Sequence, residues 1–275
     1  MIWSGQRQSK LVSETHGTFD FMSWHTGRLA AFDIETTGTD TENDRIVTAS
    51  VSLVGNGMDT VSRNWLVDPG VEIPAEATAV HRITTEMART EGQPAAEAVS
   101  QITLLLAEQL AQDIPVIAFN ARFDLTILDR EARRYGLEPL VEMIGGPDAM
   151  LVIDPYVLDK NYNMYRSGKR TLSILCQAYG ITLDDAHTAD ADALAAARLA
   201  WKLANLAEEL QQFDLPSLHE HQIEWARSQA AELQSYFESK GRNERIEGAW
   251  PIVPVPSLVA EVTDISSPLP IAPAA

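Results

Sequence analysis

Two carboxylates spaced two residues apart are the pair with the clearest chemical meaning in this sequence. Asp33 and Glu35 lie in the segment AFDIETTG, residues 31–38, directly after the apolar residues 29–32. Side chains of a strand alternate between its faces, so both acids point the same way. Two acids on a central strand repel each other and lose hydration, which a cation would relieve. We therefore predict a divalent metal site. An edge strand whose acids face water is the alternative, and the apolar flank disfavours it.

Three further segments carry side chains suited to the same chemistry. Asp124 follows the apolar segment 114–119, at the end of a predicted strand, where open α/β sheets bind ligands. His187 precedes Asp192 by five residues at the start of an Ala-rich helix, and His81 precedes the first long helix. Oxygen ligands suit Mg²⁺ or Mn²⁺, and two such ions can hold both the attacking and the leaving oxygen of a phosphodiester displacement. A neutral histidine can take the proton of the attacking water. The set predicts metal-assisted phosphodiester hydrolysis.

Three motifs, in this order, resemble the DnaQ-like 3′–5′ exonucleases of the DEDDh type. They are FDIETTG at 32–38, NARFD at 120–124, and His187 with Asp192. This family includes the proofreading epsilon subunit of bacterial DNA polymerase III, RNase T and oligoribonuclease. The resemblance covers residues 29–205 and implies an RNase H-like α/β fold. The FDIETTG form is more similar to the proofreading branch, which implies a partner in the replication machinery.

The resemblance also implies a role for each matching residue. Asp33 would bridge two divalent ions, with Glu35 and Asp192 completing the site of one ion and Asp124 holding the other. His187 would be the general base. The residues that the resemblance places around the terminal nucleotide are Thr36, Thr37, Gly38, His81, Phe119, Asn120 and Phe123.

Two positions depart from the family pattern. Phe119 stands where many members have histidine, and a phenyl ring can abut the substrate but cannot form a hydrogen bond with it. Arg82 stands where glycine is frequent, so it either adds a phosphate contact or is a solvated arginine; we favour the second. We therefore expect the grip on the terminal nucleotide to differ from the family, while the metal site stays the same.

A local excess of positive charge occurs in residues 160–170, which contain four cations, two tyrosines and no acid. Basic residues interleaved with aromatics can neutralise phosphates and stack on unpaired bases. An ordinary solvated loop is the alternative. The position of the segment between a strand and a helix, where the family varies its substrate contacts, favours substrate binding.

The elements that must position these residues follow from apolar periodicity and turn signals. Strands are predicted at 29–35, 45–54, 59–67, 114–119 and 151–153. Helices are predicted at 94–112, 124–135, 171–179 and 189–210, with Gly136 as a left-handed cap of the second. Two hairpin strands followed by alternating helices and strands predict an α/β domain on a mixed five-stranded sheet flanked by helices.

The rest of the chain reads as extensions of this domain. Residues 1–28 are polar and predict a loose N-terminal extension, and residues 206–245 predict a helical extension. Ser217 with Glu220 resembles a capping box, and the apolar face of the following helix would pack on the parent domain or form a dimer seam. The Pro-rich residues 246–275 predict an extended tail, disordered at least beyond residue 256.

Composition sets broad limits. The chain has 275 residues, a net charge of −18 and a single cysteine, Cys176, which we expect to be a buried thiol. One cysteine fits a reducing cytoplasm, and no leader or membrane-spanning segment is apparent, so we expect a cytoplasmic protein. The acidity argues against duplex binding, but a metal-dependent nuclease that grips one strand end escapes this argument.

These features together predict a metal-dependent 3′–5′ exonuclease. It would act on single-stranded or frayed DNA ends, use two Mg²⁺ or Mn²⁺ ions and release nucleoside monophosphates. RNA trimming of the RNase T or oligoribonuclease kind is one alternative. A non-catalytic adaptor that docks a polymerase is another, and the presence of all five metal and base residues argues against it.

Overall fold

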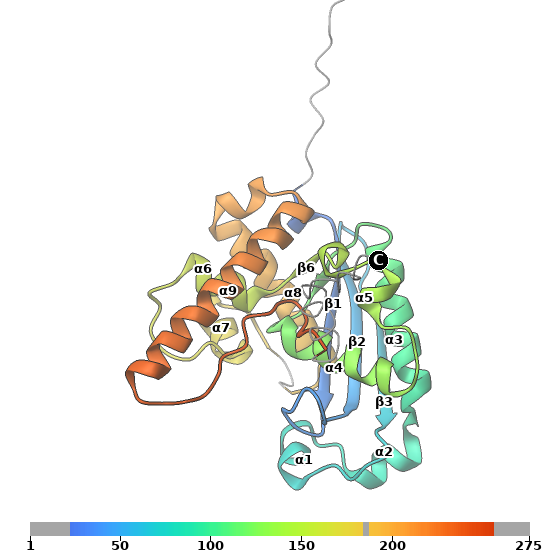
Figure 1. Ribbon diagram of the computed structural model, residues 1–275. Helices are drawn as coiled ribbons and strands as arrows, with labels where there is room; N and C mark the ends of the chain where they lie inside the picture. Colours follow the sequence, from blue (N-terminus) through green and yellow to red (C-terminus); the bar gives the residue numbers. More distant parts are fainter. Residues whose placement is uncertain (1–22, 184–186, 256–275) are drawn as a thin grey trace, which may run out of the picture.

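A mixed β-sheet forms the centre of the computed structural model, which describes residues 23–183 and 187–255 (Figure 1). Three long strands form an antiparallel meander: β1 (Arg28–Thr36), β2 (Ile46–Gly55) and β3 (Val61–Asp68). Two short strands continue the sheet parallel to β1: β5 (Val116–Ile117) and β6 (Val152–Ile153). Because parallel strands end at the same edge of a sheet, the segments that follow β1, β5 and β6 come together there.

The sheet of the described residues has six strands, in the order β4-β3-β2-β1-β5-β6, one more than the sequence predicts. The additional strand, β4 (Gln93–Pro94), pairs with the end of β3. Two residues cannot show an alternating pattern, and Pro94 was expected inside a helix that instead begins one residue later. The predicted α/β class, with a mixed sheet flanked by helices, is confirmed.

Helices cover both faces of the sheet (Figure 1). One face carries α3 (Ala95–Leu110) and α4 (Ala121–Arg134), and the other carries α8 (Ala189–Leu206). Alternate residues of β1 pack on alternate sides: Phe32 and Ile34 share a core with α3 and α4, whereas Ala31 contacts α8. The odd-numbered residues of β1, Asp33 and Glu35 among them, therefore point to the α8 side.

Shorter helices fill the connections. They are α1 (Ala75–His81), α2 (Thr85–Glu91), α5 (Leu140–Met143), α6 (Pro155–Tyr162) and α7 (Leu172–Tyr179). The sequence indicates only α7 of these. All five have eight residues or fewer and span barely two helical turns, which is too short to show a clear helical period. Gly136 has the left-handed conformation that was predicted for it, with φ of 66°. Cys176 on α7 is buried, as expected.

The predicted helix at 189–210 is two elements. α8 ends at Leu206, where Ala207 is extended, and a 3-10 turn follows at Glu208–Gln212. Burial of Ala207 and Leu210, together with a hydrogen bond from the Trp24 indole to the Leu210 carbonyl (2.7 Å), favours this break. The last helix, α9 (Leu215–Ser239), begins before the predicted capping box: Asp214 is its N-cap and accepts a hydrogen bond from the Ser217 N–H.

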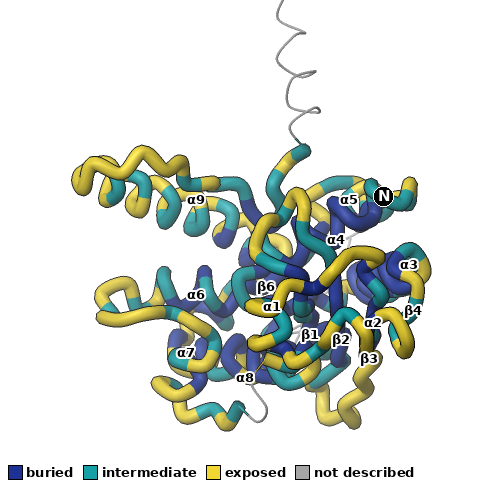
Figure 2. The backbone as a smooth tube through the Cα atoms, turned by 90° about the horizontal axis from the view of Figure 1, so that it is seen from below, coloured by how far each residue is buried: buried dark blue, intermediate teal, exposed yellow. Residues whose placement is uncertain are grey.

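The first turns of α9 complete the edge of the sheet. The Val152 N–H donates to His219 Nδ1 (3.1 Å) and the Asp154 N–H donates to Gln222 Oε1 (2.8 Å). Gln222 Nε2 donates back to the Val152 carbonyl (2.9 Å). Two side chains of α9 thus take the place of a neighbouring strand along β6, which protects an open edge. The later turns of α9 extend away from the domain and are largely exposed (Figure 2).

The ends of the described chain pack on the domain. Trp24 is buried in the core beneath α8, so the predicted N-terminal extension is part of the fold from at least this residue. Residues 246–255, the first part of the predicted tail, lie against α4 and α9, with Trp250 buried. Residues 1–22 and 256–275, on which the remaining expectations about the termini fall, lie outside the described residues. None of the described helices is long and apolar enough to cross a membrane.

Candidate active site

The close packing of α8 on the sheet brings the first carboxylates together. The face of α8 that contacts β1 and β2 is made of alanines: Ala193, Ala196, Ala197 and Ala200 are buried. Such short side chains allow a helix to approach a sheet closely. Asp192 lies in the first turn of this helix, so its carboxylate reaches the face from which Asp33 and Glu35 project.

Asp124 reaches the same cluster from the opposite side of the sheet. β5 pairs with β1 only at Ala30 and Ala31, so the backbone of β1 beyond these residues has no neighbouring strand on that side. Asp124 Oδ1 accepts a hydrogen bond from the N–H of Ile34 at 3.2 Å. The Asp124 side chain, 3 % exposed, therefore lies against β1 between its two acids.

The electrostatics of this cluster favour the binding of a cation. Burial, followed by the charges of Asp124, Asp192 and Glu35, raises the pKa of Asp33 well above its usual range. Burial also raises the pKa of Asp124, although the N–H of Ile34 opposes part of the shift. Burial and then Asp192 raise the pKa of Glu35 to about 7. Acids placed so that they disfavour one another's charge are typical of a cation site.

His187 joins the cluster beside two of the acids. Ligand atoms of Glu35, His187 and Asp192 all lie within 4.8 Å of one another. The His187 N–H donates to Asp192 Oδ2 (3.3 Å), while Asp192 Oδ1 is buried and has no hydrogen-bond partner within the described residues. An orphaned carboxylate oxygen beside other hard oxygen donors fits a divalent cation such as Mg²⁺ or Mn²⁺. The structure thus gathers all five residues of the predicted metal and base set.

The turn after β1 is held by its own hydrogen bonds. Thr36 Oγ1 donates to the Gly38 carbonyl, and Thr37 Oγ1 donates to Asp44 Oδ1, both at 2.6 Å. The Asp44 carboxylate also approaches Gly38 so closely that a Cβ there would lie 2.5 Å from Asp44 Oδ2. Glycine at residue 38 therefore lets the turn close, and the turn lies beside the acids of β1.

His81 and His187 line one pocket. The pocket has a volume of about 270 Å³ and also contains Thr48 and Asn64 from β2 and β3, two residues for which the sequence gives no signal. His81 is buried, and its Nδ1 accepts a hydrogen bond from the Ile83 N–H (3.1 Å). Burial lowers the pKa of His81, with the Thr36 backbone opposing part of the shift. Burial thus favours the uncharged form of the His81 imidazole.

Phe119 and Asn120 form the turn between β5 and α4. The Phe119 ring is half-buried and meets the Tyr156 ring edge-on, with centroids 5.8 Å apart. Asn120 adopts the left-handed conformation (φ 61°), which asparagine tolerates, and α4 starts directly after it. Phe123 is partly buried and packs against the core cluster under α4.

Asp154 is a residue near the site that sequence reasoning missed. Its carboxylate is buried and accepts hydrogen bonds from the N–H groups of Asn120 (2.9 Å) and Ala121 (3.0 Å). Burial raises the pKa of Asp154 to about 6, although these bonds oppose the shift. An aspartate before Pro155 signals a helix N-cap, which it also is for α6, but its contact with the Asn120 turn cannot be read from that pattern.

The basic segment 160–170 is partly neutralised by an acid that precedes it. Arg170 Nε donates to Asp159 Oδ2 (2.7 Å), and Arg166 lies 3.7 Å from the same oxygen. The Lys160 ammonium lies 5.4 Å from the centroid of the Tyr156 ring. Two of the four cations are therefore tied to a buried carboxylate, which weakens the expectation that the whole segment contacts phosphates.

Comparisons with known proteins agree with this geometry. Residues 30–200, more than half of the chain, match the family model described as Exonuclease. The DNA polymerase III PolC-type of Clostridium perfringens (strain 13 / Type A) is 28% identical over 191 residues, or 69% of this chain. The protein of that name from Listeria monocytogenes is 27% identical over 183 residues, or 66% of this chain. The match spans only 12% of each relative's length.

Solved structures show the same fold. Escherichia coli Exonuclease I in complex with a dT13 oligonucleotide superposes with a TM-score of 0.54 at 21% identity, covering 66% of this chain and 42% of that one. A moderately thermophilic Exonuclease I from Methylocaldum szegediense gives 0.55 at 22% identity, covering 68% and 42%. On the family match, the sheet order and the gathered DEDDh residues, this chain belongs to the exonuclease family, as a DnaQ-like 3′–5′ exonuclease domain of the DEDDh type.

Proposed function

We propose that this chain hydrolyses phosphodiester bonds at the 3′ end of single-stranded or frayed DNA and releases nucleoside monophosphates. The observation that carries the proposal is the convergence of Asp33, Glu35, Asp124 and Asp192 from β1, α4 and α8. Four acids at one point destabilise the metal-free fold, because their negative charges repel one another. Their clustering therefore has no structural benefit. A cation-dependent reaction accounts for their presence.

The four carboxylates would hold two divalent ions, Mg²⁺ or Mn²⁺. These ions, when bound, supply a Lewis acid for the attacking water and stabilise the charge that develops on the leaving oxygen. The carboxylates favour this role because they are preorganised by the backbone: Asp33 and Glu35 by the strand, and Asp124 by the Ile34 N–H. An Exonuclease I structure described as its zinc-bound form supports a divalent metal in this fold.

His187 would accept the proton of the attacking water. The water oxygen attacks phosphorus, the bond from phosphorus to the 3′ oxygen of the preceding nucleotide breaks, and that oxygen is protonated from solvent. His187 is exposed, so after each turnover its proton can pass to solvent. Its ring lies within 4.8 Å of ligand atoms of Glu35 and Asp192, at the point where that water would be activated.

The terminal nucleotide would lie between the Thr36–Gly38 turn, His81 and Phe119. Phe119 offers an apolar face without hydrogen-bonding capacity, and His81 would add a polar contact. DNA is favoured over RNA because Exonuclease I has been solved with single-stranded DNA and because the sequence relatives are DNA polymerases. The same relatives favour a partner in the replication machinery.

Digestion of matched oligonucleotides tests the proposal. Purified protein with Mn²⁺ or Mg²⁺ should shorten a 5′-labelled single-stranded DNA stepwise, and faster than RNA of the same sequence. Asp33→Ala should abolish the activity without unfolding the protein. Faster digestion of the RNA would instead assign RNA trimming, and robust activity in excess chelator would exclude the two-metal mechanism.

A further inference from the structure

We propose that the C-terminal segment 246–255, here called the strap, positions two loops of the active site. The loops are the turn at 119–121 and the loop at 38–45 that follows β1. The inference rests on the proposed function, because it assigns the loops to metal and substrate binding. The strap contacts each loop through one buried charged side chain: Asp154 for the first and Arg130 for the second.

The first connection runs through Asp154. The indole Nε1 of Trp250 donates to Asp154 Oδ2 at 3.2 Å, and the same carboxylate accepts the N–H groups of Asn120 and Ala121. Trp250 is 7% exposed, and its ring packs against His219 of α9 with centroids 5.2 Å apart. The strap therefore delivers a rigid donor to the carboxylate that holds the Asn120 turn.

The position of this turn controls functional side chains. Asn120 adopts the left-handed conformation, and its N–H is held there by the Asp154 carboxylate. Phe119 lies directly before it, and Asp124 lies one helical turn after it on α4. Loss of the indole donor leaves Asp154 Oδ2 with only the Ala121 N–H, so the buried carboxylate is less well compensated. A shift of the turn would move Phe119 and Asp124 together.

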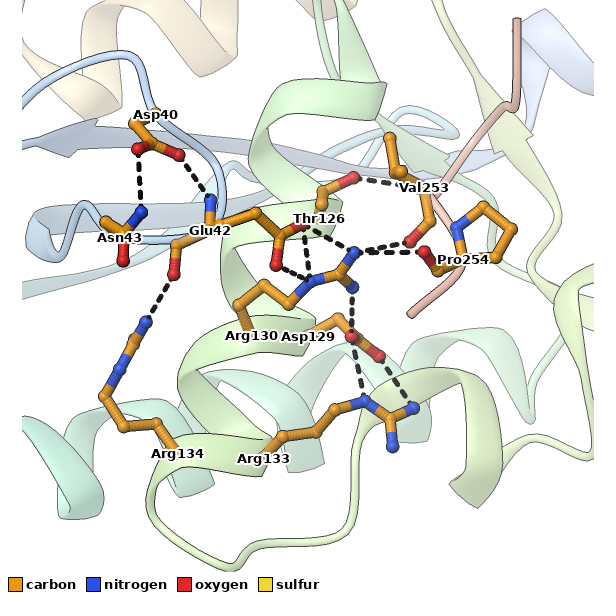
Figure 3. A network of polar contacts seen from close by, with 10 residues as sticks. All are labelled: Asp40, Glu42, Asn43, Thr126, Asp129, Arg130, Arg133, Arg134, Val253 and Pro254. Atoms are coloured by element: carbon orange, nitrogen blue, oxygen red, sulfur yellow. Dashed lines mark hydrogen bonds and ion pairs between the residues drawn. The ribbon is translucent and has the colours of Figure 1, made fainter. Parts of the chain in front are cut away.

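The second connection runs through Arg130 on α4 (Figure 3). Arg130 is 6% exposed, and its Nη2 donates to the carbonyls of Val253 (2.9 Å) and Pro254 (3.4 Å) in the strap. Its Nε and Nη2 also donate to the carboxylate of Glu42, at 2.9–3.0 Å. The Val253 N–H donates to Thr126 Oγ1 (3.0 Å), which fixes the strap along the helix.

Glu42 links Arg130 to the loop at 38–45, which lies beside the Thr36–Gly38 turn. Its backbone carbonyl accepts a second hydrogen bond from α4, from Arg134 (2.9 Å). The loop returns to the Thr36–Gly38 turn through Asp44, which accepts the Thr37 hydroxyl. Arg130 forms a bidentate contact with Glu42, and its remaining N–H groups donate to the strap carbonyls and to Asp129 (Figure 3). Only the planar guanidinium group, with its five N–H donors, can make all of these contacts at once.

Two full-length variants test the two connections separately. Trp250→Phe keeps the apolar ring in place but removes the indole donor. Glu42→Gln keeps the shape of the side chain but removes the charge that pairs with Arg130. The matched control is Glu142→Gln. Glu142, on α5, pairs at 2.8 Å with Arg133, which lies on α4 like Arg130, and it is exposed to a similar degree as Glu42. Among the described residues the Glu142 side chain has no hydrogen bond or ion pair to the strap or to the loop at 38–45.

The readouts separate positioning from simple stability. A merely structural role lowers the melting temperature or the active fraction, but leaves KM and the Mn²⁺ concentration at half-maximal rate unchanged. We expect Trp250→Phe to raise the Mn²⁺ half-saturation concentration and the KM for 5′-labelled single-stranded DNA by about three- to tenfold. Glu42→Gln should raise mainly KM, because its loop bears on the nucleotide turn. Glu142→Gln should match the wild type in both.

The outcomes also distinguish this inference from the proposed function. Wild-type protein that shows no metal-dependent nuclease activity overturns the proposed function itself. Active wild type, together with variants whose KM and Mn²⁺ half-saturation equal those of Glu142→Gln, overturns the positioning role. If Trp250→Phe is poorly folded at the assay temperature, Glu42→Gln, on an exposed side chain, decides the question alone.

Discussion

The hydrogen bond from the Ile34 N–H to Asp124 Oδ1 (3.2 Å) joins the first turn of α4 to the central strand. It exists because β5 is shorter than β1, which leaves the backbone of Ile34 without a neighbouring strand on the β5 side. Asp124 fills that place and thereby lies between Asp33 and Glu35. The acid from the far side of the sheet is thus positioned by the strand that carries the other two.

Replacement of Asp33 separates stability from activity. Asp33→Asn removes an ionisable group whose charged form is disfavoured by burial and then by the neighbouring acids, so the metal-free protein should melt at a higher temperature than the wild type. Turnover should fall by about 10²- to 10³-fold or more, because a group that stabilises transition-state charge is lost. Thermal melts in chelator and oligonucleotide digestion with Mn²⁺ measure the two effects. The exposed Asp59→Asn is the control, and a lower metal-free melting temperature for Asp33→Asn would contradict the charge-repulsion account.

The raised pKa of Glu35 predicts a pH dependence for stability and metal binding. Glu35 has a pKa of about 7 in the folded protein against 4.5 when unperturbed, so the metal-free folded state holds this proton where the unfolded chain has released it. The contribution to stability is present below pH 4.5 and is lost as the pH rises through about 7. Metal binding must displace the proton, so the increase in melting temperature caused by Mn²⁺ should grow between about pH 5.5 and about pH 8.

Glu35→Gln provides the control for this titration. The variant has no proton to release at residue 35, so the growth of the Mn²⁺ effect with pH should be smaller than in the wild type. An equal pH dependence in both proteins would assign the proton release to another group.

His187→Ala tests the proton acceptor. Because the four carboxylates remain, the Mn²⁺ half-saturation concentration should change little, whereas turnover should fall by about 10²- to 10⁴-fold, as for loss of a general base. Steady-state rates across a Mn²⁺ titration give both quantities. Parallel losses in turnover and in metal affinity would make His187 a ligand, which its distance of less than 4.8 Å from Glu35 and Asp192 permits.

Arg82 tests the left-handed cap of α1. It has φ of 67°, a conformation that disfavours side chains with a Cβ and favours glycine. Arg82→Gly should therefore raise the free energy of unfolding by about 1 kcal/mol, or the melting temperature by about 2–4 °C. Arg89→Gly, inside α2, should instead destabilise by about 1 kcal/mol. We expect an unchanged KM for DNA in Arg82→Gly, and an increase would show that Arg82 contacts a phosphate.

The sequence predicts those features that depend on a few neighbouring residues. Asp33 and Glu35 share a face because strand alternation is a local property, and Asp124 follows a strand end because the apolar segment before it is local too. The long helices show their period over several turns. The helices α1 and α6 and the strand β4 contain too few residues to show one.

The tertiary structure alone decides which distant groups meet. The Trp250 indole contacts Asp154 across 96 positions of sequence, and Arg130 pairs with Glu42 across 88. Asp159 likewise pairs with Arg170, which weakens the prediction that the whole basic segment 160–170 binds phosphates. The charge composition of the segment does not show which of its cations are already neutralised. The sequence by itself determined the chemistry of the acids, since their types and local geometry suffice for it. What holds the loops around them was decided by the path of the chain, because buried polar groups must find partners wherever the fold brings them.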